Sequence, residues 1–130
     1  MSHHTEVKVR FYELDPYDHV NHTSYLGYFE SARVEALDAI GFGMNVLKEA
    51  GFQIVVVELN ARFLAPAGLH DVLEIGTEVA ETARASSKWR QEMRRDGNLI
   101  ATLEVRAAFT DLEGRPHRPP DGFVEAMLKL

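Results

Sequence analysis

Apolar and polar positions follow two different periods along the chain, and the changes between them mark the expected elements. Residues 7–12 alternate, which predicts a strand. From Tyr25 to Ile40 the apolar residues recur every three or four positions, which predicts a long and largely buried helix. Gly41 is expected to end that helix as its C′ residue. A second, short helix is expected over 42–50.

Beyond Gly51 the pattern becomes that of long strands. We expect four of them, over 52–64, 72–79, 86–95 and 99–109. Asp96-Gly97, between the last two, is a strong hairpin signal, and a short amphipathic helix is expected from about Asp121. One strand, one long helix and then four strands joined by short turns predict a single α+β domain over 1–130, with the sheet wrapped against the helix.

The stretch 15–26, between the first strand and the long helix, is dense in polar groups. Asp15 precedes a proline, which disfavours a helical backbone at Asp15 and keeps it extended. Either Asn21 or Thr23 can cap the helix. The backbone N–H groups from about His22 onward then form a helix N-terminus that attracts anions. A carboxylate facing such a terminus can attack a carbonyl group whose oxygen the N–H groups hold.

Composition and charge narrow the classes of function. The 130 residues carry a net charge of −6, with 45% hydrophobic and 26% charged residues, as in globular proteins. The acidic balance argues against a nucleic-acid surface, and the lack of cysteine excludes disulfides and thiolate metal sites. No apolar run approaches the roughly 18 residues of a membrane span, and residues 1–6 lack the apolar core of a signal peptide. We therefore expect a cytoplasmic protein that binds neither nucleic acid nor membrane.

Two histidines in the polar stretch raise the question of a metal site. His19 and His22 have i, i+3 spacing, but no set of histidines and carboxylates with metal-ligand spacing surrounds them. We expect no metal, and we assign His19 to the turn as a hydrogen bonder. Asn21 is expected to be a cap first, with a contact to the substrate as a second role.

Three groups of residues carry a resemblance to a known family. The longest consists of Val9-Arg10, Asp15-Pro16, His19-Val20-Asn21 and Tyr25-Leu26-x-Tyr28-Phe29-Glu30-x-Ala32-Arg33. The shorter groups are Arg62-Phe63-x-x-Pro66-Ala67 with Asp71-x-Leu73, and Gly97 and Ala101 followed by Phe109-x-Asp111-x-x-Gly114-x-Pro116. On these residues the chain resembles the hotdog-fold acyl-CoA thioesterases of the 4-hydroxybenzoyl-CoA thioesterase type.

The resemblance implies a fold, an assembly and a site. The implied fold is a long central helix wrapped by a curved five-stranded antiparallel sheet. Two such units pair edge to edge, giving a homodimer or homotetramer with active sites at the dimer interface. Asp15 falls on the catalytic carboxylate, and the backbone N–H of His22 falls on the donor that polarises the thioester carbonyl. The implied coenzyme A contacts are Arg84, Ser86 and Ser87, and no metal or redox cofactor is implied.

Other positions add to this picture or compete with it. Many family members have Gly where this chain has Asp18, but Asp tolerates turn conformations, so the turn should persist. Tyr25 is a candidate substrate contact on the helix, as His19 is in the turn. Glu30 and Glu35 on the helix are rival catalytic carboxylates. For Glu30, an ordinary ion pair with Arg33 at i, i+3 is the favoured interpretation.

The predicted function is hydrolysis of an acyl- or aroyl-CoA thioester to the free acid and coenzyme A. Asp15 acts either as a general base on water or as a nucleophile, and the sequence leaves both routes open. The main alternative is a non-catalytic protein that binds acyl-CoA or an acyl carrier. A structural hotdog subunit and a hotdog dehydratase are further alternatives.

Overall fold

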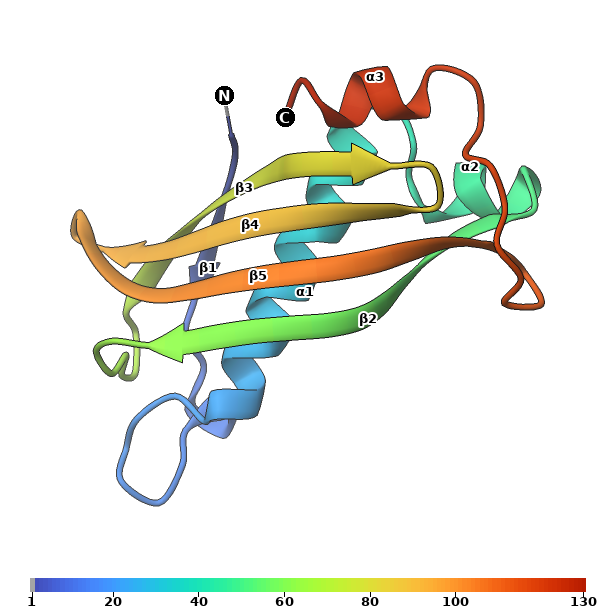
Figure 1. Cartoon of the computed structure of the whole chain (residues 1–130). Coiled ribbons are helices and arrows are strands. Elements are labelled where there is room, and N and C mark those ends of the chain that lie inside the picture. The colour runs from blue at the N-terminus through green and yellow to red at the C-terminus, as the bar shows by residue number, and fades with distance from the viewer. Residues whose placement is uncertain (1) are drawn as a thin grey trace.

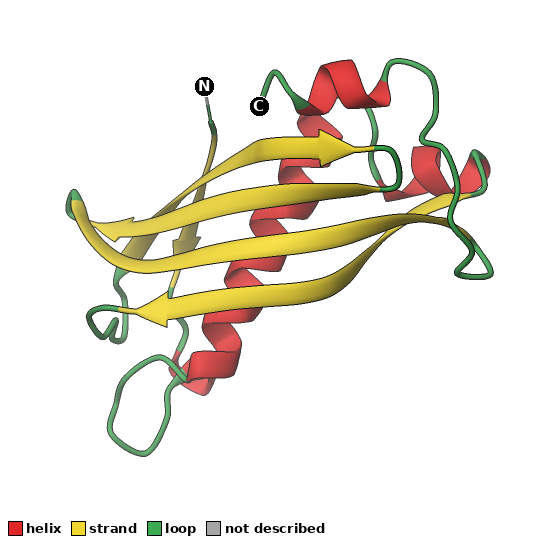
Figure 2. Ribbon diagram, in the orientation of Figure 1, coloured by secondary structure: helices red, strands yellow, loops and turns green. Residues whose placement is uncertain are grey.

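The computed structural model describes residues 2–130 and shows one long helix lying behind a five-stranded sheet (Figures 1 and 2). The elements in chain order are β1 (His3–Lys8), the 3-10 helix η1 (Phe11–Glu13), α1 (His22–Ala39), α2 (Met44–Glu49), β2 (Phe52–Phe63), β3 (Val72–Ala83), β4 (Ser86–Arg95), β5 (Asn98–Asp111) and α3 (Phe123–Met127). All strand pairs are antiparallel, in the order β1-β3-β4-β5-β2. This arrangement confirms the predicted hotdog fold.

Helix α1 has the buried stripe that its sequence predicts. Phe29, Ala32 and Ala36 are fully buried against the inner face of the sheet. The helix ends in a Schellman motif at Gly41, whose φ of 83° needs a residue without a Cβ. The N–H of Gly41 donates to the Asp38 carbonyl at 3.1 Å, which satisfies a group that the last turn leaves free. The predicted role of Gly41 is confirmed.

The β4–β5 hairpin also forms at its predicted turn. Asp96 and Gly97 have φ angles of 51° and 82°, so both central residues are left-handed, as a two-residue hairpin requires. Strand β3 runs to Ala83, four residues beyond its predicted end at Val79. A shift in register between Val79 and Glu81 marks a bulge, and a bulge breaks the alternation on which the prediction rested.

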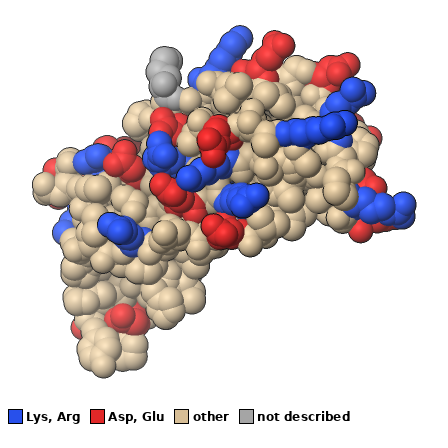
Figure 3. All heavy atoms as spheres, in the orientation of Figure 1, with Lys and Arg blue, Asp and Glu red and all other residues tan. Residues whose placement is uncertain are grey.

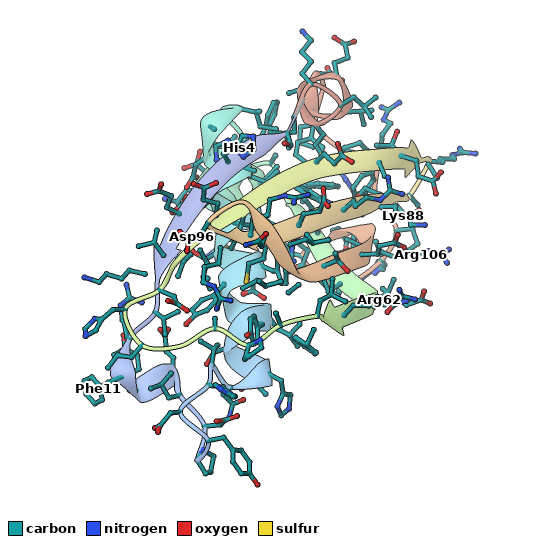
Figure 4. The ribbon with its side chains drawn as sticks, turned by 90° about the vertical axis from the view of Figure 1, so that its left-hand side faces the viewer. His4, Phe11, Arg62, Lys88, Asp96 and Arg106 are labelled. Carbon is teal, nitrogen blue, oxygen red and sulfur yellow. The ribbon has the colours of Figure 1, made fainter. Side chains whose placement is uncertain are left out.

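The first strand has the predicted length but lies four residues nearer the N-terminus than predicted, over His3–Lys8. β1 ends at Lys8 instead of reaching residue 12, and the chain turns into η1. The cause is local, because the Glu13 carboxylate accepts a hydrogen bond from the Arg10 N–H at 2.8 Å and bends the backbone. Phe11 and Tyr12 are consequently exposed, and Figure 4 shows the Phe11 ring pointing away from the body of the protein.

The remaining helices close one end of the core. α2 and α3 lie within the ranges expected for short helices, and α3 brings Phe123 into a cluster of rings with Phe42, Phe52 and Phe109. No helix within residues 2–130 combines the length and the apolar character that a membrane crossing needs.

Candidate active site

The polar loop of residues 15–20, which we call the Asp15 loop, leads directly into α1. An antiparallel bridge between Leu14 and Val20 closes its base. Across the loop the Asp15 N–H donates to the His19 carbonyl at 2.7 Å. The residues that follow η1 and the start of α1 therefore lie side by side, at the lower end of α1 in Figure 1.

Asp18 occupies the position where many family members have Gly. Its φ of 61° is left-handed, and its N–H donates to the Asp15 carbonyl at 3.1 Å. The turn thus forms with an aspartate at the strained position, as predicted, because a short polar side chain tolerates this conformation better than most.

The Asp15 carboxylate is half-buried and held from one side. Its Oδ1 accepts hydrogen bonds from the N–H groups of Tyr17, at 2.8 Å, and His19, at 3.2 Å. Its Oδ2 has no hydrogen-bond partner within residues 2–130. One oxygen therefore orients the side chain, while the other is available to a water molecule or a substrate. His19 contributes to the turn through its backbone.

The start of α1 presents one free amide beside this loop. Asn21 is the cap, and its Oδ1 accepts from the N–H of Thr23 at 2.9 Å and from the hydroxyl of Thr23 at 2.8 Å. The Asn21 carbonyl accepts a hydrogen bond from the N–H of Ser24 at 2.9 Å. The exposed N–H of His22 is left without an acceptor in the described chain, and it can donate to an anion.

Tyr25, predicted as a substrate contact, is buried with its hydroxyl inside the protein. The hydroxyl accepts a hydrogen bond from the Ala67 N–H at 3.0 Å, and the ring packs on Phe63 with centroids 5.2 Å apart. Burial raises the pKa of Tyr25. The phenol therefore stays neutral at ordinary pH.

Sequence reasoning missed a contact between Tyr28 and Glu13. The Tyr28 hydroxyl donates to Glu13 Oε1 at 2.7 Å, which ties α1 to η1. Burial and this hydrogen bond to a carboxylate raise the pKa of Tyr28 well above its ordinary value. No periodicity could have found the pair, because its members belong to different elements.

The expected ion pair between Glu30 and Arg33 is wrong. Arg33 turns under the sheet and donates to Gln91 Oε1 at 2.8 Å, while no ion pair joins it to Glu30 in the described residues. Gln91, fully buried, donates in turn to the Phe29 carbonyl at 2.8 Å and to the Thr77 hydroxyl at 3.0 Å. Burial lowers the pKa of the Arg33 guanidinium. Glu30 stays exposed.

The residues predicted to contact coenzyme A lie at the β3–β4 turn. Arg84 is exposed in the turn itself, and Ser86 is half-buried at the start of β4. Ser87 is 2% exposed, and its hydroxyl accepts from Trp89 Nε1 at 3.0 Å, so this hydroxyl serves the core. Ser86 and Ser87 line an open groove of about 540 Å³, and Arg84 stands outside its wall.

Two cations that were not predicted as coenzyme A contacts line the same groove. Lys88 and Arg106 face each other across β4 and β5, and Figure 4 shows them at one end of the sheet. The neighbouring Glu104 carboxylate lies 3.5 Å from the Lys88 ammonium. Figure 3 shows cations and carboxylates interleaved over this face of the sheet.

The groove and the Asp15 loop do not meet within one chain. In Figure 1 the loop lies below the sheet at the start of α1, whereas the β3–β4 turn lies at the upper right of the sheet. The structure therefore brings together Asp15, Asn21 and His22, and it separates them from Arg84 and its neighbours. Within residues 2–130, no three histidine or carboxylate side chains gather as metal ligands.

Comparisons with known proteins agree with this arrangement. The family profile described as the thioesterase-like superfamily matches residues 9–127. The chain is 31% identical over 120 residues to the chloroplastic acyl-acyl carrier protein thioesterase ATL2 of Arabidopsis thaliana, covering 91% of this chain and 64% of that protein. It is also 31% identical over 112 residues to the long-chain acyl-CoA thioesterase FadM of Escherichia coli K12, covering 84% of this chain and 83% of FadM.

A solved structure shows the same likeness in three dimensions. The crystal structure of a probable thioesterase from Bartonella henselae superposes with a TM-score of 0.87 at 27% identity, covering 92% of this chain and 100% of that one. This chain belongs to the thioesterase-like superfamily. Its length spans just under two thirds of ATL2.

Proposed function

We propose that the protein hydrolyses acyl- or aroyl-CoA thioesters to the free acid and coenzyme A. One observation carries the proposal: a half-buried carboxylate, with one oxygen fixed and one free, lies in a closed loop that leads into a helix whose first amide is unoccupied. Asp15 supplies the carboxylate and His22 the amide. The names of relatives such as FadM support the reaction class.

Each of the two groups has a role in breaking the thioester. Asp15 takes a proton from water as that water attacks the carbonyl carbon. Alternatively, it attacks that carbon itself and forms a mixed anhydride that water then hydrolyses. In both routes the His22 N–H donates to the oxygen as negative charge develops on it, and the thiolate of coenzyme A leaves and takes up a proton. Removing one such donor typically costs about 10²–10³ in kcat.

We propose coenzyme A, and not an acyl carrier protein, as the carrier of the acyl group. FadM is named for acyl-CoA and is matched over most of its length, whereas ATL2 is named for an acyl carrier protein and is matched over less. Lys88 and Arg106 offer a groove with cations for the phosphates of coenzyme A.

A cysteine-free sequence supports a cytoplasmic location.

We also propose a homodimer or homotetramer whose active sites combine two chains. β2 is an edge strand, and a long apolar edge favours pairing with another chain. Its exposed apolar side chains are Val55, Val56, Val57, Leu59 and Phe63. A second chain also offers a way to bring a groove next to the Asp15 loop, which the first chain's own groove does not reach.

Substitution of Asp15 tests the proposed reaction. Asp15→Asn keeps the size and one oxygen of the side chain but removes its base and its nucleophile, so we expect kcat to fall by about 10³ or more. The measurement is release of free thiol from a panel of acyl-CoA esters, repeated with the same acyl groups on a carrier protein. Glu30→Gln is the matched control, because Glu30 is an exposed carboxylate on α1. Full activity of Asp15→Asn together with an inactive Glu30→Gln would move the reaction to the helix.

A further inference from the structure

The segment 64–71, between β2 and β3, holds the Asp15 loop through a single residue. Ala67 is 1% exposed and uses both of its backbone polar groups. Its carbonyl accepts the N–H of Val20 at 2.8 Å, and its N–H donates to the Tyr25 hydroxyl at 3.0 Å. Val20 closes the base of the Asp15 loop, and Tyr25 lies in the first turn of α1. Ala67 therefore contacts both structures that carry the proposed catalytic groups.

An ion pair fixes this segment on both sides of Ala67. Arg95, at the end of β4, donates to the Pro66 carbonyl at 2.6 Å and to Asp71 Oδ2 at 3.1 Å. The same Asp71 oxygen accepts the N–H of Gly68 at 2.8 Å. The side chains of Arg95 and Asp71 are each 31% exposed, so the pair is shielded from most of the solvent. In Figure 4 the segment runs between the turn at Asp96 and the loop that follows Phe11.

The charges of this pair also reach Tyr25 in the first turn of α1. Besides burial, which raises the pKa of Tyr25 most, the guanidinium of Arg95 lowers that pKa, and the carboxylates of Asp15 and Asp71 raise it. Arg95, Asp15 and Asp71 therefore all lie close enough to Tyr25 for their charges to affect it, although the four residues come from different parts of the chain.

We propose that Arg95 and Asp71 are positioning residues for the proposed thioesterase reaction. They hold segment 64–71 in place, and Ala67 transmits that position to the Asp15 loop and to α1. The proposal rests on the proposed function, because it concerns the placement of Asp15. A displacement of about 1 Å in a catalytic group can cost about 10²-fold in rate. Replacing either residue also leaves the other half-buried charge without an ion-pair partner.

Neighbouring arginines on β4 give a matched test. Arg94 pairs with Glu92 at 3.2 Å and donates to the Gly97 carbonyl, so among the described residues it contacts the hairpin and not segment 64–71. We expect Arg95→Gln to lower kcat about 10- to 100-fold, with KM changed less than about threefold, and Arg94→Gln to leave both constants unchanged. Equal effects of the two variants on kcat, or a change confined to KM, would overturn the proposal.

Two further variants separate positioning from folding. A single planar nitrogen of Arg95, Nη1, donates to both acceptors. Arg95→Lys keeps the charge but replaces this fixed donor with a rotatable ammonium on a different stem. We therefore expect Arg95→Lys to fold and to show an intermediate kcat even if Arg95→Gln does not fold. Because Asp71 and Arg95 act as one unit, Asp71→Asn combined with Arg95→Gln should lower kcat no more than the worse single variant. Wild-type kcat in Arg95→Lys, or additive losses in the double variant, would contradict a joint positioning role.

Amide hydrogen exchange supplies a readout that activity cannot. In Arg95→Lys the N–H groups of Val20 and Ala67 should exchange faster, while the N–H of Phe29 in the middle of α1 should not change. Unchanged exchange at Val20 and Ala67 would overturn the inference. If Asp15→Asn is inactive while Arg95→Gln and Arg95→Lys are fully active, only this inference fails. If Asp15→Asn is fully active, the proposed function fails first.

Discussion

The two carboxylate oxygens of Asp15, the proposed catalytic residue, differ in their hydrogen bonds. Oδ1 accepts two N–H groups of its own loop, from Tyr17 and His19, which fixes the direction of Oδ2. The amide of His22 is free for a related reason, because the Asn21 side chain takes the N–H of Thr23 and leaves the first one. At the scale of single residues, the loop's own backbone orients the Asp15 carboxylate of the proposed site.

The role assigned to the His22 amide can be tested by removing that amide alone. His22 is the first residue of α1, where proline is tolerated, and Asn21 has the extended backbone that a following proline favours. We expect His22→Pro to keep the helix and to lower kcat about 10²–10³-fold. Circular dichroism checks the helix, and thiol release gives kcat. His22→Ala, which keeps the N–H, is the control and should retain kcat. A fully active His22→Pro would remove this amide from the mechanism.

At the scale of elements, α1 is attached to its neighbours by buried polar contacts as well as by packing. Gln91 of β4 holds the helix through the Phe29 carbonyl and through Arg33. Tyr28 attaches α1 to η1 through Glu13. These contacts set the position of the helix N-terminus relative to the loop, because the apolar stripe alone leaves room for the helix to slide.

The raised pKa of Tyr28 predicts loss of stability in alkali. When the pH rises above 10.0, the ordinary pKa of tyrosine, the phenol of the unfolded chain ionises. The phenol of the folded protein stays neutral at the same pH. Its contribution to the free energy of unfolding is therefore complete below pH 10 and falls by up to about 1.4 kcal/mol for each pH unit above it. Urea unfolding of wild type and Tyr28→Phe should show a gap that is constant from pH 7 to 9 and shrinks above pH 10. A gap independent of pH would contradict this assignment.

At the scale of the whole molecule, two features of the single chain remain incomplete. The β2 edge exposes apolar side chains on a strand that pairs with β5 on one side only, and the groove beside Arg84 lies far from Asp15. A homo-oligomer that pairs two such edges satisfies the first feature, and a site shared between chains satisfies the second. The proposed assembly thus follows from the outline of the fold as well as from the family resemblance.

Mixing two damaged chains tests the shared site. Arg84 stands beside the groove and is the coenzyme A contact that the family resemblance predicts. Arg84→Ala should therefore raise KM and leave kcat nearly unchanged, because a phosphate contact far from the thioester acts equally in the ground and transition states. In a mixed dimer with Asp15→Asn, one of the two shared sites contains neither substitution. Co-refolding equal amounts should restore about a quarter of the wild-type rate at low substrate concentration.

Two results would contradict the shared site. The first is a mixture that only averages the rates of its separate parents, because sites built within one chain cannot complement each other. The second is light scattering that shows a stable monomer at micromolar concentration. Asp15→Asn mixed with wild type is the control for subunit exchange.

The sequence by itself determined the order of the elements and the local chemistry of the site. The α1 stripe, the turn at Asp96-Gly97 and the end of the helix at Gly41 were predicted correctly, because periodicity and left-handed φ angles depend on neighbouring residues. The candidate site residues Asp15 and His22 were also assigned from a continuous stretch of sequence.

Only the tertiary structure decided which distant groups meet. Arg33 donates to Gln91, 58 residues away in the sequence, instead of pairing with Glu30 on its own helix. Ala67 donates to Tyr25, which is 42 residues away in the sequence. Such partners belong to different elements and leave no trace in a local period. The physical reason is that a buried polar group takes whichever partner the packed elements bring within hydrogen-bond distance. That choice is made when α1 packs on the sheet.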